Sequence, residues 1–266
     1  MTAAPLGVFD SGIGGLTVAR ALFERLPRES VIYFGDTARV PYGPKSPETV
    51  RRYSGEILAY LLRRGVKAVV VACNTSTAHA LDALKQRSPV PIIGVIEPGA
   101  RAAVAASRTG AIGVIGTAGT IASGAYERAI MALRPDARVH AQPCPLFVPL
   151  VEEGWFDHPA AELIAREYLA PLRQAGVDVL VLGCTHYPLL QPLLARVMGP
   201  GVTLVDSAAE TATAVAQELA RLGLLADGGG KTHEHHFVVS DDEPHFRKIG
   251  ARFLGEKIKR VEVVPL

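Results

Sequence analysis

The sequence predicts two similar α/β domains with mainly parallel sheets, related by pseudo-two-fold symmetry, with the functional site in the cleft between them. The first observation is a repeat, in which the stretch from Val66 to Leu84 returns as Val177 to Leu190. Each copy reads as a buried strand, a cysteine at its carboxyl end, and small polar residues that open a helix. The second observation is that Gly7 to Ser11 resembles Gly113 to Thr117, and these segments are separated by nearly the same number of residues as the two cysteine segments. Both matches indicate an internal duplication.

Length and composition agree with this organisation. The chain has 266 residues, of which 48% are hydrophobic and 20% are charged. That length exceeds one average domain, and that balance is typical of a compact globular chain rather than a disordered one. Two domains of one α/β class are therefore expected.

The chain opens with a short apolar strand, Leu6 to Phe9, followed by the glycine-rich turn Asp10 to Gly15. Three glycines in this turn let backbone amides approach an anion at the start of the next helix. Asp10 lies at the strand's carboxyl end, where it either caps that helix or takes part in chemistry. Further strands are expected at 31–34 and 90–95, and helices at 16–26 and 47–64.

A long loop between the second strand and the second helix is rich in turn formers. Loops at the carboxyl ends of strands bind ligands in open α/β sheets. Pro41, Tyr42 and Gly43 in this loop therefore either line a pocket or form a plain turn around a packed tyrosine.

The remaining elements divide the chain into a continuous and a discontinuous domain. A first crossing is expected near Glu97 to Gly99 and a return near Asp206. Helices are expected at 99–107, 119–133, 158–175, 210–224 and 243–254, and strands at 111–116, 137–141, 202–205, 235–239 and 261–264. Residues 1–97 and 207–266 would then form the first domain, and residues 98–206 the second.

Cysteine usage predicts a reducing compartment. Three cysteines without secretory features indicate free thiols in the cytoplasm rather than a disulfide framework. Cys73 and Cys184 lack the spacing of zinc ligands, and the His-rich stretch at 232–236 reads as a loop entering a strand, so no metal site is expected. Cys144, between two prolines, is interpreted as structural.

Several partner classes find no support. The formal net charge is +2 and the basic residues are scattered, so the sequence does not indicate a basic surface that binds nucleic acid. No apolar run approaches the roughly 20 residues that cross a bilayer, and the start of the chain does not resemble a signal peptide, so no membrane association is expected. The first glycine-rich turn lacks the last glycine of a dinucleotide fingerprint, which disfavours a nicotinamide cofactor.

The two repeated cysteines suggest acid–base chemistry. A thiol at a strand end beside a helix amino terminus is expected to have a pKa below about 8.5, because the helix dipole favours the thiolate. Two such thiols facing one substrate can remove a proton from one face of a carbon and return one to the other face, which inverts a stereocentre. The competing interpretation, two small buried hydrophobes, does not account for their duplicated polar neighbours.

Those neighbours are candidates for binding a small acidic substrate. Asn74 and Thr75 follow the first cysteine, and Thr185 and His186 follow the second. Amide, hydroxyl and backbone N–H groups at helix starts can hold a carboxylate. Asp10 and His186 are also candidates to orient or tune the thiols.

Five motifs, in this order, resemble those of the glutamate racemase family over residues 7 to about 250. They read DSGIGGLTV, FGDTARVPYG, VACNTS, VPLVEEG and LGCTHYPLL. The resemblance implies two α/β domains with the active site in their cleft, cofactor-independent interconversion of L- and D-glutamate, and supply of D-glutamate for bacterial peptidoglycan. It also leads us to expect a cytoplasmic homodimer, although the sequence gives neither the dimer geometry nor a regulator.

The resemblance assigns roles to matching positions of this sequence. Cys73 and Cys184 become the acid/base pair, assisted by three further residues. These assisting residues are Asp10, Glu152 and His186. The substrate would be held by Asp10, Ser11, Pro41, Tyr42, Gly43, Asn74, Thr75, Thr185 and His186.

Three alternatives remain open. An aspartate racemase of the same superfamily would use the same paired thiols with a pocket of different volume. A non-catalytic two-domain protein could hold an amino acid in its cleft, but it would leave the duplicated cysteines unexplained. A pyridoxal-phosphate racemase needs a suitable lysine, and none of the seven lysines lies in a convincing site.

Overall fold

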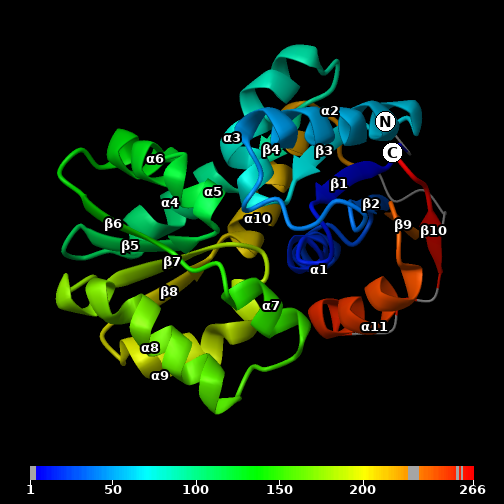
Figure 1. Ribbon diagram of the computed structural model, residues 1–266. Helices are drawn as coiled ribbons and strands as arrows, with labels where there is room; N and C mark the ends of the chain where they lie inside the picture. Colours follow the sequence, from blue (N-terminus) through cyan, green and yellow to red (C-terminus); the bar gives the residue numbers. More distant parts are fainter. Residues whose placement is uncertain (1–3, 227–233, 256–257, 259) are drawn as a thin grey trace.

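The computed structural model describes residues 4–226, 234–255, 258 and 260–266, and within them the strands form two parallel sheets (Figure 1). The larger sheet has six strands in the order β10-β9-β2-β1-β3-β4, each pair parallel. Its strands are β1 (Leu6–Asp10), β2 (Val31–Gly35), β3 (Ala68–Val71), β4 (Ile92–Gly94), β9 (His235–Val239) and β10 (Val261–Val263).

The smaller sheet has four parallel strands among the described residues, in the order β6-β5-β7-β8. Its strands are β5 (Ala111–Gly116), β6 (Arg138–Pro143), β7 (Val179–Gly183) and β8 (Thr203–Asp206). The order β2-β1-β3-β4 in the larger sheet matches the order β6-β5-β7-β8 in the smaller one. The two halves therefore repeat one topology, as the matching cysteine segments predict.

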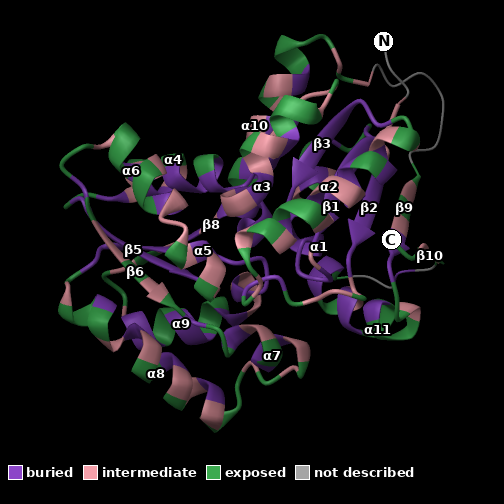
Figure 2. Cartoon of the chain, turned by 45° about the horizontal axis from the view of Figure 1, so that its top comes forward, coloured by how far each residue is buried: buried purple, intermediate pink, exposed green. Residues whose placement is uncertain are grey.

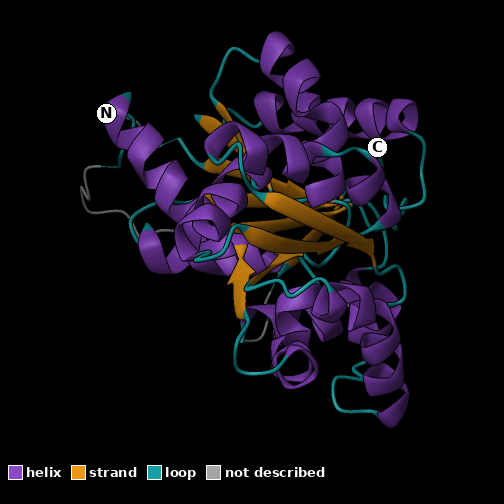
Figure 3. Cartoon of the chain, turned by 90° about the vertical axis from the view of Figure 1, so that its left-hand side faces the viewer, coloured by secondary structure: helices purple, strands orange, loops and turns teal. Residues whose placement is uncertain are grey.

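Helices cover both faces of each sheet, as the side view in Figure 3 shows. On the larger sheet, α2 (Pro47–Arg63) and α3 (Asn74–Arg87) pack on one face. The opposite face packs against α1 (Leu16–Arg25), α10 (Ser207–Arg221) and α11 (Glu243–Leu254). This two-sided cover explains why the strands read as nearly continuous apolar runs.

The smaller sheet is covered in the same way. One face packs against α4 (Ile96–Ala106) and α6 (Ala125–Leu133). The other face packs against α7 (Phe147–Glu152), α8 (Pro159–Gln174) and α9 (Gln191–Met198). Figure 2 shows the inner strands β1, β2, β3, β5 and β7 as buried, whereas β6 and β10, at the sheet edges, have intermediate and exposed positions.

One hydrophobic cluster joins the two halves. It contains Leu16 and Phe246 from helices of the larger sheet together with Leu169 and Leu194 from helices of the smaller sheet. The association of the halves is thus supported by apolar burial as well as by the chain crossings.

The two points at which the chain is predicted to pass between the domains lie close to the starts of helices. The expected boundary between residues 97 and 98 falls in the first turn of α4, because Glu97 and Pro98 are already helical. Proline is tolerated there, since the first N–H groups of a helix have no intrahelical partner. The expected boundary at 206 and 207 coincides with the start of α10, which Asp206 caps by accepting a hydrogen bond from the Ala208 backbone N–H at 2.9 Å. The division into two domains remains a prediction.

Three helix predictions need correction. The helix expected at 119–133 is two helices, α5 (Ala118–Ala122) and α6, because Gly124 between them has a φ of +64°. The helix expected from residue 99 begins at Ile96, and the one expected from residue 210 begins at Ser207. The short helices α7 and α9 were not predicted, since each has too few residues for a clear apolar period.

No helix within the described ranges is both long and apolar enough to cross a bilayer.

Two glycine substitutions test the break between α5 and α6. Gly124→Ala should lower the free energy of unfolding by about 1 kcal/mol, because a Cβ disfavours the left-handed conformation. Gly55→Ala, inside α2 with nothing within 4 Å of the added Cβ, should raise it by about 0.5–1 kcal/mol. Urea denaturation followed by circular dichroism measures both. Equal effects of the two substitutions would contradict the assigned role of Gly124.

Candidate active site

Both sheets place their functional segments at a switch in strand order. In the larger sheet the chain passes from β1 to β2 on one side and then to β3 on the other, and in the smaller sheet from β5 to β6 and then to β7. Ligands bind outside the carboxyl ends of strands at such points. Cys73 follows β3 and Cys184 follows β7, so each cysteine stands at the switch point of its own sheet.

Cys73 is the N-cap residue of α3. Its backbone is extended, and its Sγ accepts a hydrogen bond from the Ser76 N–H at 3.4 Å. Asn74 and Thr75 form the first turn of the helix, where backbone N–H groups lack intrahelical partners. The sequence prediction of a cysteine opening a helix is confirmed for this half.

Cys184 differs in its local structure. The segment after it is a single 3₁₀ turn, Tyr187–Leu190, and the helix α9 starts only after that turn. Its Sγ lies 4.0 Å from Nδ1 of His186. The expected helix amino terminus directly beside this thiol was therefore wrong, and an imidazole takes that place.

One small pocket brings the two cysteines together. Its volume is about 30 Å³, which is enough to hold a water molecule. The residues that line it are Ser11, Val40, Pro41, Tyr42, Gly43, Cys73, Asn74, Thr75, Thr117, Val148, Cys184, Thr185 and His186. Every predicted substrate-binding residue except Asp10 is in this set.

Asp10 lies under the pocket rather than on its wall. Its carboxylate is fully buried, accepts the Gly12 backbone N–H at 2.9 Å and lies 3.5 Å from the Thr185 hydroxyl. Burial raises the pKa of Asp10, while the nearby His186 and backbone N–H groups act to lower it. The helix that follows β1 is capped by Gly15 without a side-chain bond, so Asp10 is not its N-cap.

Glu152 and His186 form a pair beside the second thiol. Glu152 ends α7, and its Oε1 lies 2.9 Å from Nε2 of His186, which is 3% exposed. Burial disfavours the charged imidazole, but its contacts with Cys184 and Glu152 outweigh this and raise the pKa of His186 to about 10. Burial opposes the charge of Glu152 as well, yet its hydrogen bond with His186 keeps its pKa below the usual value.

The two halves meet in close contact around the pocket. A Cβ added to Gly14 would lie 2.2 Å from the Thr185 hydroxyl oxygen and 2.5 Å from Nδ1 of His186, so this position needs glycine. Across the pocket, the Thr75 and Thr117 hydroxyl oxygens are 2.9 Å apart. The C-terminal helix also takes part, since Phe253 packs edge-on against His186 and α11 lies beside α7 in Figure 1.

A buried carboxylate holds the loop that carries Pro41, Tyr42 and Gly43. Asp36 accepts hydrogen bonds from the Tyr42 hydroxyl, from Arg39 Nε at 2.7 Å and from the Ser240 hydroxyl at 2.8 Å. Ser240 follows β9, so the C-terminal strand also fixes this loop. The structure combines the two interpretations, because Tyr42 is packed against Val50 and Tyr53 while its loop also lines the pocket.

Thr117 is a pocket residue that the sequence analysis did not single out. It follows β5, and its hydroxyl accepts the Thr120 N–H at 3.2 Å and so caps α5. The signal was present, because the match of Gly7–Ser11 to Gly113–Thr117 makes Thr117 the counterpart of Ser11. Both residues lie on the pocket wall.

The expected lowering of the Cys73 pKa by the helix dipole was wrong. Burial and the negative charge of Asp10 raise the pKa of Cys73 to about 11, although the Ser76 N–H and nearby hydroxyl groups act to lower it. Cys144, by contrast, is buried away from the pocket, and the Tyr187 hydroxyl donates to its carbonyl at 2.8 Å. Its structural interpretation fits this position.

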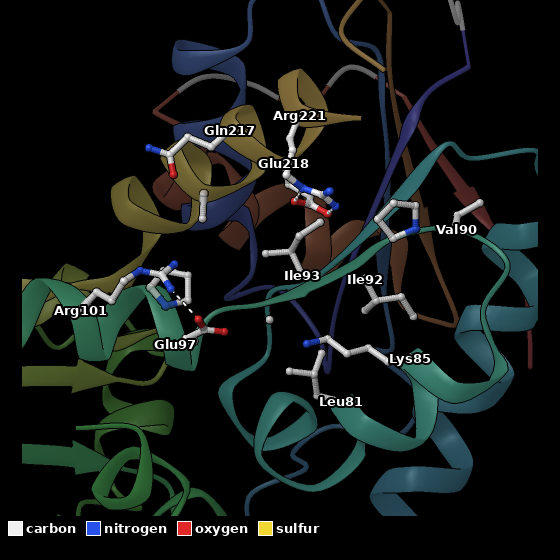
Figure 4. Close-up of a pocket in the computed structure, with 14 residues that line it drawn as sticks. Leu81, Lys85, Val90, Ile92, Ile93, Glu97, Arg101, Gln217, Glu218 and Arg221 are labelled. Atoms are coloured by element: carbon white, nitrogen blue, oxygen red, sulfur yellow. Dashed lines mark hydrogen bonds and ion pairs between the residues drawn. The ribbon is translucent and has the colours of Figure 1, made fainter. Parts of the chain in front are cut away.

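A larger hollow lies elsewhere, between β4, α3, α4 and α10 (Figure 4). Its volume is about 610 Å³, and among the described residues that line it there is no predicted site residue. Glu97 pairs with Arg101 at 2.5 Å and Glu218 pairs with Arg221 at 2.8 Å, so much of its charge is internally compensated.

The described part of the chain contains no cluster of three or more His, Cys, Asp or Glu side chains arranged for a metal ion. Of the His-rich stretch, residues 232 and 233 lie outside the described residues. His235 stacks on Phe23 with ring centroids 3.6 Å apart.

Comparison with known proteins points to one family. A family model described as Asp/Glu/Hydantoin racemase matches residues 11–215. A glutamate racemase of Geobacter metallireducens is 56% identical over 261 residues, covering 98% of this chain and 96% of that protein. A solved glutamate racemase of Bacillus anthracis has a TM-score of 0.94 at 42% identity, covering 99% and 98% of the two chains. One of Francisella tularensis in complex with D-glutamate has a TM-score of 0.92 at 37% identity, covering 98% and 97%.

Replacing Asp10 tests its effect on the first thiol. Asp10→Asn removes a negative charge that raises the pKa of Cys73, so the thiolate should form at a lower pH than in the parent protein. Iodoacetamide alkylation of Cys73, followed across pH 7–11 by peptide mass spectrometry, measures the shift. Asp82→Asn, on the exposed face of α3, is the matched control. An unchanged or higher onset pH in Asp10→Asn would contradict the electrostatic coupling.

Proposed function

The chain belongs to the Asp/Glu/Hydantoin racemase family, and we propose that it is a glutamate racemase that interconverts L- and D-glutamate by a two-thiol mechanism without a cofactor. The observation that carries the proposal is the pairing of Cys73 and Cys184 on one small pocket, each at the switch point of its own sheet. Two thiols on opposite sides of a bound amino acid can serve as base and acid for inversion.

The proposed reaction moves one proton at each face of Cα. For L-glutamate, the Cys184 thiolate removes the Cα proton and becomes a thiol, leaving a carbanion whose charge is shared with the α-carboxylate. The Cys73 thiol then donates its proton to the opposite face, giving D-glutamate and a Cys73 thiolate. The reverse reaction starts from the Cys73 thiolate, so a proton must return between the two sulfurs before the next turnover in the same direction.

The charges around the two thiols agree with Cys184 as the base and Cys73 as the acid toward L-glutamate. A protonated His186, stabilised by Glu152, places positive charge beside Cys184, the sulfur proposed as the base for L-glutamate. Asp10 places negative charge near Cys73 and favours its neutral thiol. Cys73 would thus be suited to act as the acid toward L-glutamate, which leaves the role of base to Cys184.

Substrate binding would use the groups around both thiols. Backbone N–H groups in the first turn of α3, the Asn74 amide and the Thr185 hydroxyl are suited to a carboxylate. The loop of Pro41, Tyr42 and Gly43, with Ser11, would bind the remaining polar groups. The pocket between the thiols is small, so we expect the loops around it to shift when substrate binds.

We extend the proposal to the setting of the enzyme. Its product would be D-glutamate for peptidoglycan, made in the cytoplasm, where the three free cysteines would remain reduced. We also expect a homodimer on the basis of the family resemblance, and light scattering coupled to gel filtration tests that state.

Solvent isotope exchange tests the proposed activity. In D2O, without added pyridoxal phosphate, metal or nicotinamide, the protein should convert L-glutamate to D-glutamate and introduce deuterium at Cα, because the donated proton comes from an exchangeable thiol. Chiral chromatography with mass spectrometry measures both. Aspartate should react at least about tenfold more slowly, since its shorter chain misplaces one carboxylate. Faster turnover of aspartate would favour an aspartate racemase, and binding without exchange would favour a non-catalytic binding protein.

Single cysteine substitutions test the two-base mechanism. Cys73→Ser and Cys184→Ser should each abolish racemisation in both directions, because a serine hydroxyl is a poor base at neutral pH. Loss of HX from a glutamate analogue with a leaving group on the β-carbon needs only one base. Cys73→Ser should therefore retain elimination from the L-configured analogue, and Cys184→Ser from the D-configured one.

The rate of elimination is measured from the amount of leaving group released into solution. Cys144→Ser, at a buried position away from the pocket, controls for loss of a thiol in general and should keep racemase activity. Action of both active-site variants on the same enantiomer would rule out thiols on opposite faces of Cα.

A further inference from the structure

Tyr126 connects the smaller sheet's helices to the first cysteine segment. It lies on α6 and is 3% exposed, and its hydroxyl donates a hydrogen bond of 2.7 Å to Oδ1 of Asn74. Asn74 belongs to α3, which packs on the larger sheet. A tyrosine from one half of the molecule therefore holds a side chain of the other half, directly after Cys73.

This hydrogen bond determines which end of the Asn74 amide faces the pocket. Asn74 lines the pocket and Tyr126 does not, and because Oδ1 is engaged by Tyr126, Nδ2 is the amide atom left for a ligand in the pocket. Nδ2 is buried and has no hydrogen-bond partner among the described residues. A buried donor without a partner is costly, unless a ligand that accepts hydrogen bonds supplies the missing contact.

Tyr126 is held so that its hydroxyl acts as a donor to Asn74. The Ser207 side chain, at the start of α10, acts on the same hydroxyl and lowers its pKa. Burial raises the pKa of Tyr126, which keeps the phenol protonated. A protonated phenol has a proton to donate to Oδ1.

Two glycines leave room for this tyrosine. A Cβ at Gly99, on α4, would lie 3.3 Å from the Tyr126 hydroxyl oxygen. A Cβ at Gly183 would lie 3.0 Å from its ring and 2.6 Å from the Ile115 carbonyl oxygen. Gly183 directly precedes Cys184, so the ring packs beneath the second cysteine segment while its hydroxyl reaches the first.

We infer that Tyr126 is a positioning residue that fixes the Asn74 amide with its N–H donors toward the substrate carboxylate. The inference rests on the proposed racemase function. Without the phenol, Oδ1 loses its partner and the amide can rotate, which would present an oxygen to the carboxylate and repel it. Tyr126 never contacts the substrate in this scheme, and it acts only through Asn74.

A double-mutant cycle on kcat/KM tests the inference. Tyr126→Phe should raise KM for glutamate about tenfold and lower kcat by less than about threefold, because the lost interaction serves mainly to bind a carboxylate. Asn74→Ala should have at least as large an effect on KM. In the Asn74→Ala background, Tyr126→Phe should change kcat/KM by less than about twofold, since the group that it orients is gone.

Tyr60→Phe is the matched control. Its ring is also buried, but its hydroxyl contacts Arg64 on α2, outside the pocket. It should leave KM and kcat unchanged. Circular dichroism and thermal melting of every variant establish that the fold is intact. If Tyr126→Phe does not fold, Ser207→Ala serves in the same cycle and should raise KM in the parent but not in Asn74→Ala.

The outcomes separate the inference from the proposed function. A parent protein without racemase activity would overturn the function. Activity in the parent, with equal losses from Tyr126→Phe in both backgrounds or no loss in either, would overturn the role of Tyr126. A loss confined to kcat would also overturn it, because amide orientation would then not limit binding.

Discussion

The structure depends on the convergence of two parallel sheets at one buried point. The carboxyl ends of β1, β3, β5 and β7 come from switch points of identical strand order, and the segments after them line the same small pocket. Because Asp10, Cys73 and His186 are almost completely buried, each charge there acts strongly on its neighbours. Burial raises the pKa of Asp10 and of Cys73, and only paired contacts keep His186 charged.

Much of this arrangement could be predicted from the sequence, since it follows local patterns. A strand, a cysteine and small polar residues occur twice, and carboxyl ends of parallel strands meet at one edge of a sheet. That reasoning identified Cys73, Cys184 and their neighbours. The same repeat makes Thr117 the counterpart of Ser11, and both residues line the pocket.

Other features depend on contacts between residues far apart in the chain. Asn74 and Tyr126 are 52 positions apart, and the pairing of Glu152 with His186 spans 34. No period or spacing in the sequence indicates that a tyrosine on α6 meets the amide after Cys73. The pKa of Cys73 could not be predicted from the sequence for the same reason. The sequence indicates a helix amino terminus beside this thiol, but it does not indicate that the thiol is buried near Asp10.

The duplicated halves share a topology but differ where the proposed chemistry requires a difference. A two-base racemase needs one sulfur as thiolate and the other as thiol at the start of each turnover, and two identical sites would not favour either state. Here Cys73 caps an α-helix near a buried carboxylate, whereas Cys184 precedes a 3₁₀ turn and lies beside an imidazole paired with Glu152. The asymmetry arises from side chains added to a common scaffold, so the fold brings the two thiols together and gives each a different set of neighbours.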